Sequence, residues 1–195
     1  MKPFRAVILG TGFGRTVQAP AFQRHPDFEL VAVAGSNAEK TSRNAADLGL
    51  AHQDKDWRRL IAEVAPDVVS VATPVDLHHP MTLAALEAGA HVLCEKPTAL
   101  HRFQAAEMRD RAAALGRVAG INHEFRFLPA RRLALRRIRE GAIGAPRRAE
   151  IIGRYSIWPT PGARGLTWLS ERKRGGGILG ALGSHHTDCL RTIFG

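Results

Sequence analysis

The sequence has little cysteine, few aromatic side chains and no long apolar run. Its two cysteines, Cys94 and Cys189, cannot build a disulfide framework, and we expect two free thiols in a reducing, cytoplasmic compartment. No apolar stretch approaches the ~20 residues of a membrane span. The short apolar stretch near the N-terminus runs into glycines and lacks the features of a signal peptide. We therefore expect neither export nor a membrane partner.

Acidic residues are also scarce, with 18 Asp and Glu against 28 Lys and Arg, and the formal net charge is +10. Much of the excess lies in residues 129–148, where arginines alternate with apolar residues at helical spacing: Arg131, Arg132, Arg136, Arg137 and Arg139. This pattern is typical of an amphipathic helix with a solvated basic face. Base-stacking aromatics are few, so we expect no nucleic-acid partner, although a nucleic-acid-binding protein remains the third hypothesis. Attraction of anionic, phosphorylated ligands is a milder interpretation of the charge.

What the sequence does contain is an alternation of apolar and helix-like segments. Continuous runs of Val, Ile, Leu and Ala predict strands buried on both faces at 5–10, 29–35, 67–74, 90–97 and 117–123. Helices are expected between them, near 14–25, 37–48, 56–64, 78–89 and 101–115. Strand–helix–strand repetition of this kind predicts a doubly wound α/β domain with a parallel sheet over residues 1–123.

The regular alternation of expected strands and helices ends after residue 123. We expect a helix near 129–140, a longer strand at 146–158, an irregular loop at "PTPGARG" (159–165) and a small-residue helix from about 177 to 194. Residues 124–195 offer too little material for an independent domain. We therefore interpret them as the beginning of an incomplete C-terminal α+β domain for substrate and oligomerisation.

A glycine loop follows the first strand, in the order Gly10, Thr11, Gly12, Phe13, Gly14 and Arg15. A glycine turn between a strand and a helix lets the backbone approach a pyrophosphate, whose charge meets free N–H groups and the helix dipole. The spacing is G-x-G-x-G, and Arg15 occupies the place of the usual third glycine. Arg15 either bends toward phosphate oxygens or points to solvent, and a purely structural turn is the other interpretation of the loop.

The second strand ends without the acid that binds the ribose 2′-hydroxyl in NAD-dependent domains. Gly35, Ser36 and Asn37 stand there instead, with Lys40 and Arg43 one and two helical turns later. Small polar and basic groups suit a 2′-phosphate, so we expect NADP in preference to NAD. Lys40 and Arg43 are otherwise ordinary surface residues of their helix.

Polar residues also follow two other buried strands, in "VATPVDLHHP" and "HVLCEKP". The carboxyl ends of parallel strands are where open sheets bind ligands. Lys96 follows such a strand and precedes Pro97, which stiffens the backbone around it. Taken alone, Lys96 is better interpreted as a surface lysine at a strand end.

Together these segments resemble the Gfo/Idh/MocA oxidoreductase family. The resemblance rests on "GTGFGR", "VATP", "AALEAGAHVLCEKP", "FRFLPA", "GAIGAP" and "GGGILGALGSHHTD", in this order, and covers essentially the whole chain. It implies an N-terminal Rossmann domain, a C-terminal domain on a large open sheet, and hydride transfer between a nicotinamide cofactor and a sugar, polyol or related carbonyl compound.

The resemblance also implies roles for individual residues. Glu95 and Lys96 would lie by the nicotinamide, with Lys96 binding the substrate oxygen and assisting its proton transfer. Thr73, Pro74 and His78 would line the cofactor, and Arg126 would sit near the domain junction. His185 would be the second catalytic residue.

One expected acid is missing from this pattern. The family typically carries an acid four residues before the histidine, and Ala181 stands there. Positions four apart share a helix face, so the acid and the histidine normally act together. Asp188, three residues after His185, faces it from the other side or plays a structural role. We expect no metal at "HHTD", because a third ligand at a recognisable spacing is lacking. The glycines at 175–177 could bind an anion, but a turn of unusual dihedral angles is favoured.

The sequence therefore predicts an NADP- or NAD-dependent oxidoreductase acting on a sugar- or polyol-like alcohol or carbonyl. The alternative is a non-catalytic NAD(P)-binding regulatory or sensing protein of the same fold, which the Ala181 position favours. We also expect a homo-oligomer when the protein is full length, since an open sheet exposes edges that subunits can cover.

Overall fold

The computed structural model describes residues 2–154 and 167–195. The chain divides into two compact units, residues 1–122 and 123–195. The predicted loop at 159–165 lies outside the described residues.

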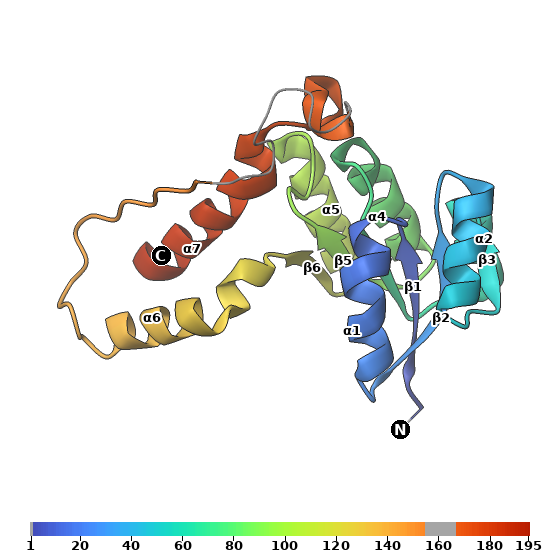
Figure 1. The fold of residues 1–195 in the computed structure, drawn as a ribbon, viewed down its shortest axis with the longest axis horizontal. Helices are drawn as coiled ribbons and strands as arrows, with labels where there is room; N and C mark the ends of the chain where they lie inside the picture. The colour runs from blue at the N-terminus through green and yellow to red at the C-terminus, as the bar shows by residue number, and fades with distance from the viewer. Residues whose placement is uncertain (1, 155–166) are drawn as a thin grey trace. The chain divides into compact units, whose positions relative to one another are not determined.

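The first unit is built on a parallel sheet, coloured blue to green in Figure 1. Its strands are β1 (Phe4–Leu9), β2 (Phe28–Ala34), β3 (His52–Asp54), β4 (Val68–Val71), β5 (His91–Glu95) and β6 (Ala119–Asn122). Their order in the sheet is β3-β2-β1-β4-β5-β6, and every neighbouring pair is parallel. This is the strand order of a dinucleotide-binding Rossmann fold, so the predicted fold class is confirmed.

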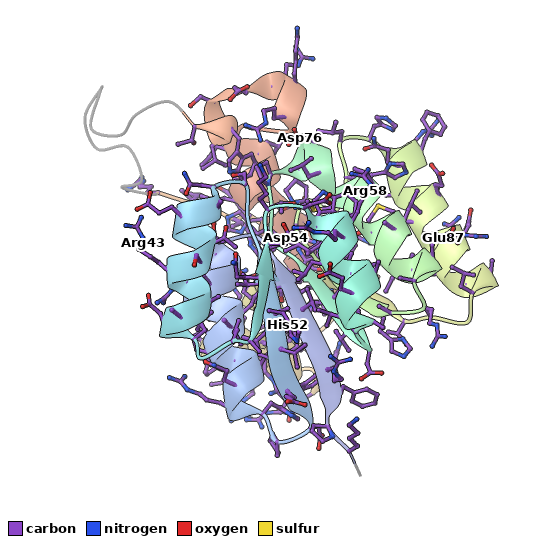
Figure 2. All side chains as sticks on the ribbon, turned by 90° about the vertical axis from the view of Figure 1, so that its right-hand side faces the viewer. Arg43, His52, Asp54, Arg58, Asp76 and Glu87 are labelled. Carbon is purple, nitrogen blue, oxygen red and sulfur yellow. The ribbon has the colours of Figure 1, made fainter. Side chains whose placement is uncertain are left out.

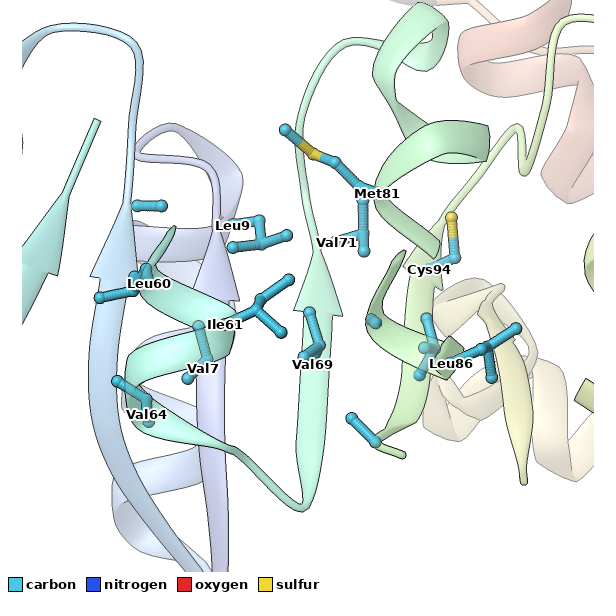
Figure 3. Packing of buried hydrophobic residues seen from close by; sticks show 14 of the residues in the cluster. Val7, Leu9, Leu60, Ile61, Val64, Val69, Val71, Met81, Leu86 and Cys94 are labelled. Carbon is cyan, nitrogen blue, oxygen red and sulfur yellow. The ribbon is translucent and has the colours of Figure 1, made fainter. Parts of the chain in front are cut away.

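Helices cover both faces of this sheet. They are α1 (Ala19–Arg24), α2 (Ala38–Asp47), α3 (Trp57–Val64), α4 (His78–Glu87) and α5 (Arg102–Ala114). Alternation along β1 divides the core into two layers. Val7 and Leu9 belong to the layer that includes α3, α4 and α5, and Figure 3 shows Ile61 of α3 beside them. Ala6 and Ile8 point the other way and pack with Ala19 and Phe22 of α1.

One strand of the sheet was not expected from the sequence. β3 spans three residues, His52–Asp54, and two of them are exposed. It pairs with β2 in parallel. Its residues are polar and form no apolar run, so the pattern that revealed the other strands is absent from it.

The regular elements of the second unit are all helices over the residues that the structure describes. It contains a short 3-10 helix (Glu124–Phe127), α6 (Pro129–Arg139), two further 3-10 turns (Trp168–Ser170 and Arg172–Arg174), a π-helix (Leu179–Gly183) and α7 (Ser184–Phe194). The strand predicted at 146–158 is wrong over 146–154, which have no regular structure, and 155–158 lie outside the described residues. A strand exists only through pairing, and no described residue of this unit pairs with 146–154.

The glycines at 175–177 form the turn that the sequence predicted. Gly175 and Gly177 have φ of +79° and +115°. At Gly176 a Cβ atom would lie 2.5 Å from the carbonyl oxygens of Trp168 and Leu169. The run is therefore explained by backbone conformation and close backbone packing.

Among the described residues, no helix is long and apolar enough to cross a membrane. Both cysteines are free thiols with buried side chains. Burial raises the pKa of the Cys94 thiol to about 11, which leaves it protonated at neutral pH.

Candidate active site

The glycine loop lies where the strand order reverses, between β1 and β4. Gly10 has φ of +125°, and a Cβ there would lie 2.1 Å from the carbonyl oxygen of Ala72, just beyond β4. A Cβ on Gly14 would lie 2.7 Å from Cγ2 of Ile8. At Gly12, by contrast, a Cβ would meet no atom of the described residues within 4 Å. The loop is therefore tightly packed at both ends and open in its middle, as a backbone cradle for a pyrophosphate requires.

The short glycine spacing has a structural counterpart. The helix after the loop begins as a π-helix, Gly14–Gln18, before it continues as α1. Gly14 thereby takes the place against β1 that lets helix and strand approach closely. The side chain of Arg15 reaches Asp47 of α2, with 3.1 Å between Nη2 and Oδ2. The sequence interpretation missed this ion pair, and the phosphate contact of Arg15 stays a prediction.

The end of β2 abuts the glycine loop. A Cβ on Gly35 would lie 2.4 Å from Cγ2 of Thr11, so only glycine fits there without a shift. Ser36 and Asn37 follow, both exposed. The Asn37 side chain caps α2 by accepting a hydrogen bond from the Lys40 backbone nitrogen at 2.8 Å. Asn37 therefore has a helix-capping role whether or not it contacts a ligand.

The basic residues near this edge differ in their partners. Arg43 projects from α2 in Figure 2 and pairs with Glu39 at 3.2 Å. The Lys40 side chain is exposed. A buried acid, Asp54, ends the neighbouring strand β3, but Arg59 engages its carboxylate at 2.6 Å through Nε. Hydrogen bonds from the Asp56 backbone and from Arg59 hold the pKa of Asp54 below its usual value, so this charge is already matched.

A buried polar chain connects the ends of β4, β5 and β6. Ser70 donates to Gln18 Oε1 at 2.6 Å, and Gln18 Nε2 donates to Glu95 Oε1 at 2.8 Å. The Asn122 amide donates to the same carboxylate oxygen at 2.6 Å. Val69 and Cys94 face the layer of α3, α4 and α5. Successive residues of a strand point to opposite faces, so Ser70 and Glu95 face the α1 layer beside Gln18. The carboxylate of Glu95 is thereby fixed at the carboxyl edge of the sheet.

Lys96 follows directly on this fixed carboxylate. Its backbone nitrogen donates to Glu95 Oε2 at 3.3 Å, and its side chain is half-buried. The peptide bond between Lys96 and Pro97 is cis. The backbone from which the Lys96 side chain extends is therefore held by the Glu95 carboxylate.

His78 ties the two strand ends together. Its Nε2 lies 2.9 Å from the carbonyl oxygen of Thr73, and its Nδ1 lies 2.9 Å from that of Pro97. Burial lowers the pKa of His78 below its usual value, against the opposite effect of the two carbonyls. A neutral imidazole carries one N–H, so it donates to one carbonyl at a time. Thr73 and Pro74 are half-buried beside it. His78 is therefore a bridge within the edge.

In the second unit, His185 begins α7 and is 1% exposed. The ring of Phe125 stacks on its imidazole, with centroids 3.9 Å apart and planes 11° apart. The ring of His123 meets it edge-on at 5.7 Å. Glu124 Oε1 lies 3.6 Å from His185 Nε2. Three consecutive residues thus contact one imidazole.

Arg126 and Asp188 form a two-pronged ion pair in the same unit. Arg126 Nε donates to Asp188 Oδ2 at 2.9 Å, and Nη2 donates to Oδ1. Burial would raise the pKa of Asp188, but the Arg126 hydrogen bond and the positive charges around it lower it overall. Both carboxylate oxygens of Asp188 therefore accept hydrogen bonds from Arg126.

Sequence reasoning missed Gln18, Ser70, Asn122 and Glu124. Ser70 carried a signal, because it is a polar residue inside the apolar run Val68–Val71. The others become visible only through contacts between distant segments. The described part of the chain holds no group of three His, Cys, Asp or Glu side chains that could bind a metal ion.

Comparison with known proteins gives matches along both units. The sequence model of an oxidoreductase family with an NAD-binding Rossmann fold, Gfo/Idh/MocA, matches residues 4–123. The Gfo/Idh/MocA C-terminal domain matches residues 132–195.

Curated relatives extend this likeness. The chain is 34% identical over 196 residues to D-glucoside 3-dehydrogenase of Escherichia coli, a match that covers 99% of this chain and 54% of that protein. It is 35% identical over 166 residues to 1,5-anhydro-D-fructose reductase of Ensifer adhaerens, covering 85% and 49%. A crystal structure of an oxidoreductase domain protein from Kribbella flavida superposes with a TM-score of 0.86 at 30% identity, covering 99% and 53%. The chain spans about half the length of the curated relatives it matches.

Proposed function

The chain belongs to the Gfo/Idh/MocA oxidoreductase family, and on that premise we propose that it transfers a hydride between a nicotinamide cofactor and a sugar- or polyol-like alcohol or carbonyl. The observation that carries the proposal is the glycine loop. Gly12 leaves the backbone open at the strand-order switch point, while Glu95 and Lys96 end β5 on the same edge of the sheet.

The residues fit a dinucleotide at three places. The open turn at Gly12 would take the pyrophosphate against the backbone N–H groups of the loop. Ser36 and Lys40 would face the adenosine ribose, and Thr73, Pro74 and His78 would lie along the nicotinamide half. When bound, the nicotinamide supplies the hydride acceptor or donor.

Lys96 would hold the substrate oxygen and move its proton. Its neighbour Glu95 is held by Gln18 and Asn122, which fixes the backbone from which the ammonium group extends. His185 would serve the same reaction as a second group that can take or give a proton near neutral pH. Arg126, bound to Asp188, would support the second unit instead of contacting the cofactor.

The cofactor preference follows from the end of β2. We propose NADP over NAD, because Ser36 and Asn37 stand where an acid would repel a 2′-phosphate, and Asp54 is engaged by Arg59. The pairing of Arg43 with Glu39 makes Lys40 the basic side chain on which this preference chiefly depends.

The relatives named above act on sugars or sugar derivatives, and this supports a substrate of that class. A second copy of the chain would cover exposed sheet edges. The second candidate is a non-catalytic NAD(P)-binding regulator, favoured by Ala181 in place of the expected acid.

A turnover assay tests the proposal. The chain is screened with NADP and NAD against a panel of aldoses, polyols and anhydrosugars, and formation of reduced cofactor is followed by absorbance. Replacing Lys96→Ala should lower kcat by about 10²-fold or more while cofactor affinity stays the same. Lys55→Ala, at an exposed lysine between β3 and α3, is the matched control and should behave like the wild type. Cofactor binding without turnover of any panel member would instead support the regulator.

A further inference from the structure

The environment of His185 contains a carboxylate that the sequence pattern did not reveal. Glu124 Oε1 lies 3.6 Å from His185 Nε2, and both residues belong to the second unit. They are 61 positions apart in the chain, so no helical spacing relates them. The contact exists because the 3-10 helix Glu124–Phe127 packs against α7.

The other acid near this histidine is engaged elsewhere. Asp188 binds Arg126 through both of its carboxylate oxygens. Burial would raise the pKa of Asp188, but the Arg126 hydrogen bond and the nearby charges of His123, Arg126 and His185 lower it overall. Asp188 therefore serves the Arg126 ion pair, and the position four residues before His185 is an alanine.

The carboxylate of Glu124 is itself poised toward the histidine. Its second oxygen, Oε2, is buried and accepts no hydrogen bond from the described residues. The stacked ring of Phe125 restricts the imidazole to one plane. A carboxylate at 3.6 Å from one ring nitrogen then favours a proton on that nitrogen and stabilises the imidazolium form.

We propose that Glu124 is the positioning residue of His185 and replaces the acid that the family pattern places at Ala181. Phe125 fixes the plane of the imidazole, and Glu124 fixes its orientation and supports its positive charge. This inference rests on the proposed function for the catalytic role of His185, but the contact itself can be tested without turnover.

Several other ionisable groups surround His185 in this unit. They are His186, Asp188 and Cys189 on α7, His123 and Arg126 on the preceding segment, and Arg131 of α6, which lies over Phe125. Their charges are the same in the wild type and in a Glu124 variant. A comparison of the two therefore isolates the contribution of Glu124.

Nuclear magnetic resonance of ¹⁵N-histidine-labelled chain provides the test. The titration of His185, assigned by its loss in His185→Gln, is compared between the wild type and Glu124→Gln. Loss of a carboxylate at 3.6 Å should lower the pKa of His185 by about one unit, a tenfold loss of proton affinity. Glu140→Gln is the matched control, because Glu140 pairs with Arg137 at the end of α6. It should leave the titration unchanged.

Two further variants keep the proposal falsifiable if Glu124→Gln disturbs folding. Glu124→Asp should keep part of the shift, and Ala181→Glu added to Glu124→Gln should restore it from the i−4 position. The same His185 titration in the wild type and in Glu124→Gln would overturn the proposal. If Glu124→Gln does not fold, a Glu124→Asp titration identical to that of the wild type, together with no rescue by Ala181→Glu, would also overturn it. With turnover established, Glu124→Gln should lower kcat and shift the pH profile while KM for the cofactor is unchanged. Absence of turnover in the wild type would count against the proposed function alone.

Discussion

At the scale of single residues, three glycines of one loop have three different surroundings. Gly10 combines a positive φ with a backbone contact at Ala72, and Gly14 packs against Ile8. Gly12 packs against nothing in the described part of the chain. Two of these glycines are thus required by the fold, while the third leaves room for a ligand.

Alanine at Gly10 and at Gly12 should separate these roles. Gly10→Ala should lower the free energy of unfolding by on the order of 3 kcal/mol, because it adds a Cβ at 2.1 Å from a carbonyl and strains a left-handed residue. Gly12→Ala should change it by less than about 0.5 kcal/mol. Urea unfolding followed by circular dichroism measures both. Equal losses in the two variants would contradict the assignment.

Some residues of the candidate site could be recognised from the sequence, and others could not for a physical reason. The glycine loop and the strand-end Lys96 could be recognised because local spacing requires particular residue types. Gln18 and Asn122 could not, since each becomes informative only when the fold brings it to Glu95. Glu124 was hidden for the same reason, because its contact with His185 joins distant segments.

At the scale of elements, the carboxyl edge of the sheet is held by bridges between neighbouring strands. His78, at the start of α4, joins the segment after β4 to the segment after β5 through Thr73 and Pro97. The Ser70–Gln18–Glu95–Asn122 chain joins β4, β5 and β6 on the other layer. Lys96 lies between Glu95, which belongs to the second bridge, and Pro97, which belongs to the first.

Acid should destabilise the folded chain through the buried His78. Burial lowers the pKa of His78 below its usual 6.5, so the unfolded chain binds a proton more readily than the folded one. The free energy of unfolding should therefore fall as the pH drops below about 6.5. Unfolding curves at pH 7.5, 6.5 and 5.5 should show a steeper loss for the wild type than for His78→Gln. Parallel losses in the two proteins would show that another group is responsible.

Elements were predictable where apolar periodicity is strong. Five strands and the helices between them follow from continuous Val, Ile, Leu and Ala runs. β3 escaped because three polar residues at a sheet edge carry no such run. Residues 146–154 were expected to form a strand and do not. Their partly alternating pattern finds no pairing partner among residues 2–154 and 167–195, and a strand forms only through pairing.

At the scale of the whole molecule, the features that we propose to bind the pyrophosphate and the nicotinamide half of the cofactor lie within residues 1–122. The six-stranded order of these described residues, the open turn at Gly12 and the fixed Glu95 all belong to one unit. The chain spans about half the length of its curated relatives.

The central claim is tested most directly by equilibrium titration with NADPH and NADH, followed by nicotinamide fluorescence. We expect saturable binding of both, tighter for NADPH, and a loss of about tenfold or more in affinity for Gly12→Ala, whose added methyl occupies the place of the pyrophosphate. Tighter binding of NADH would contradict the assignment of Ser36 and Lys40. No binding of either cofactor to the folded wild-type chain, or equal affinities for the wild type and Gly12→Ala, would contradict the account as a whole.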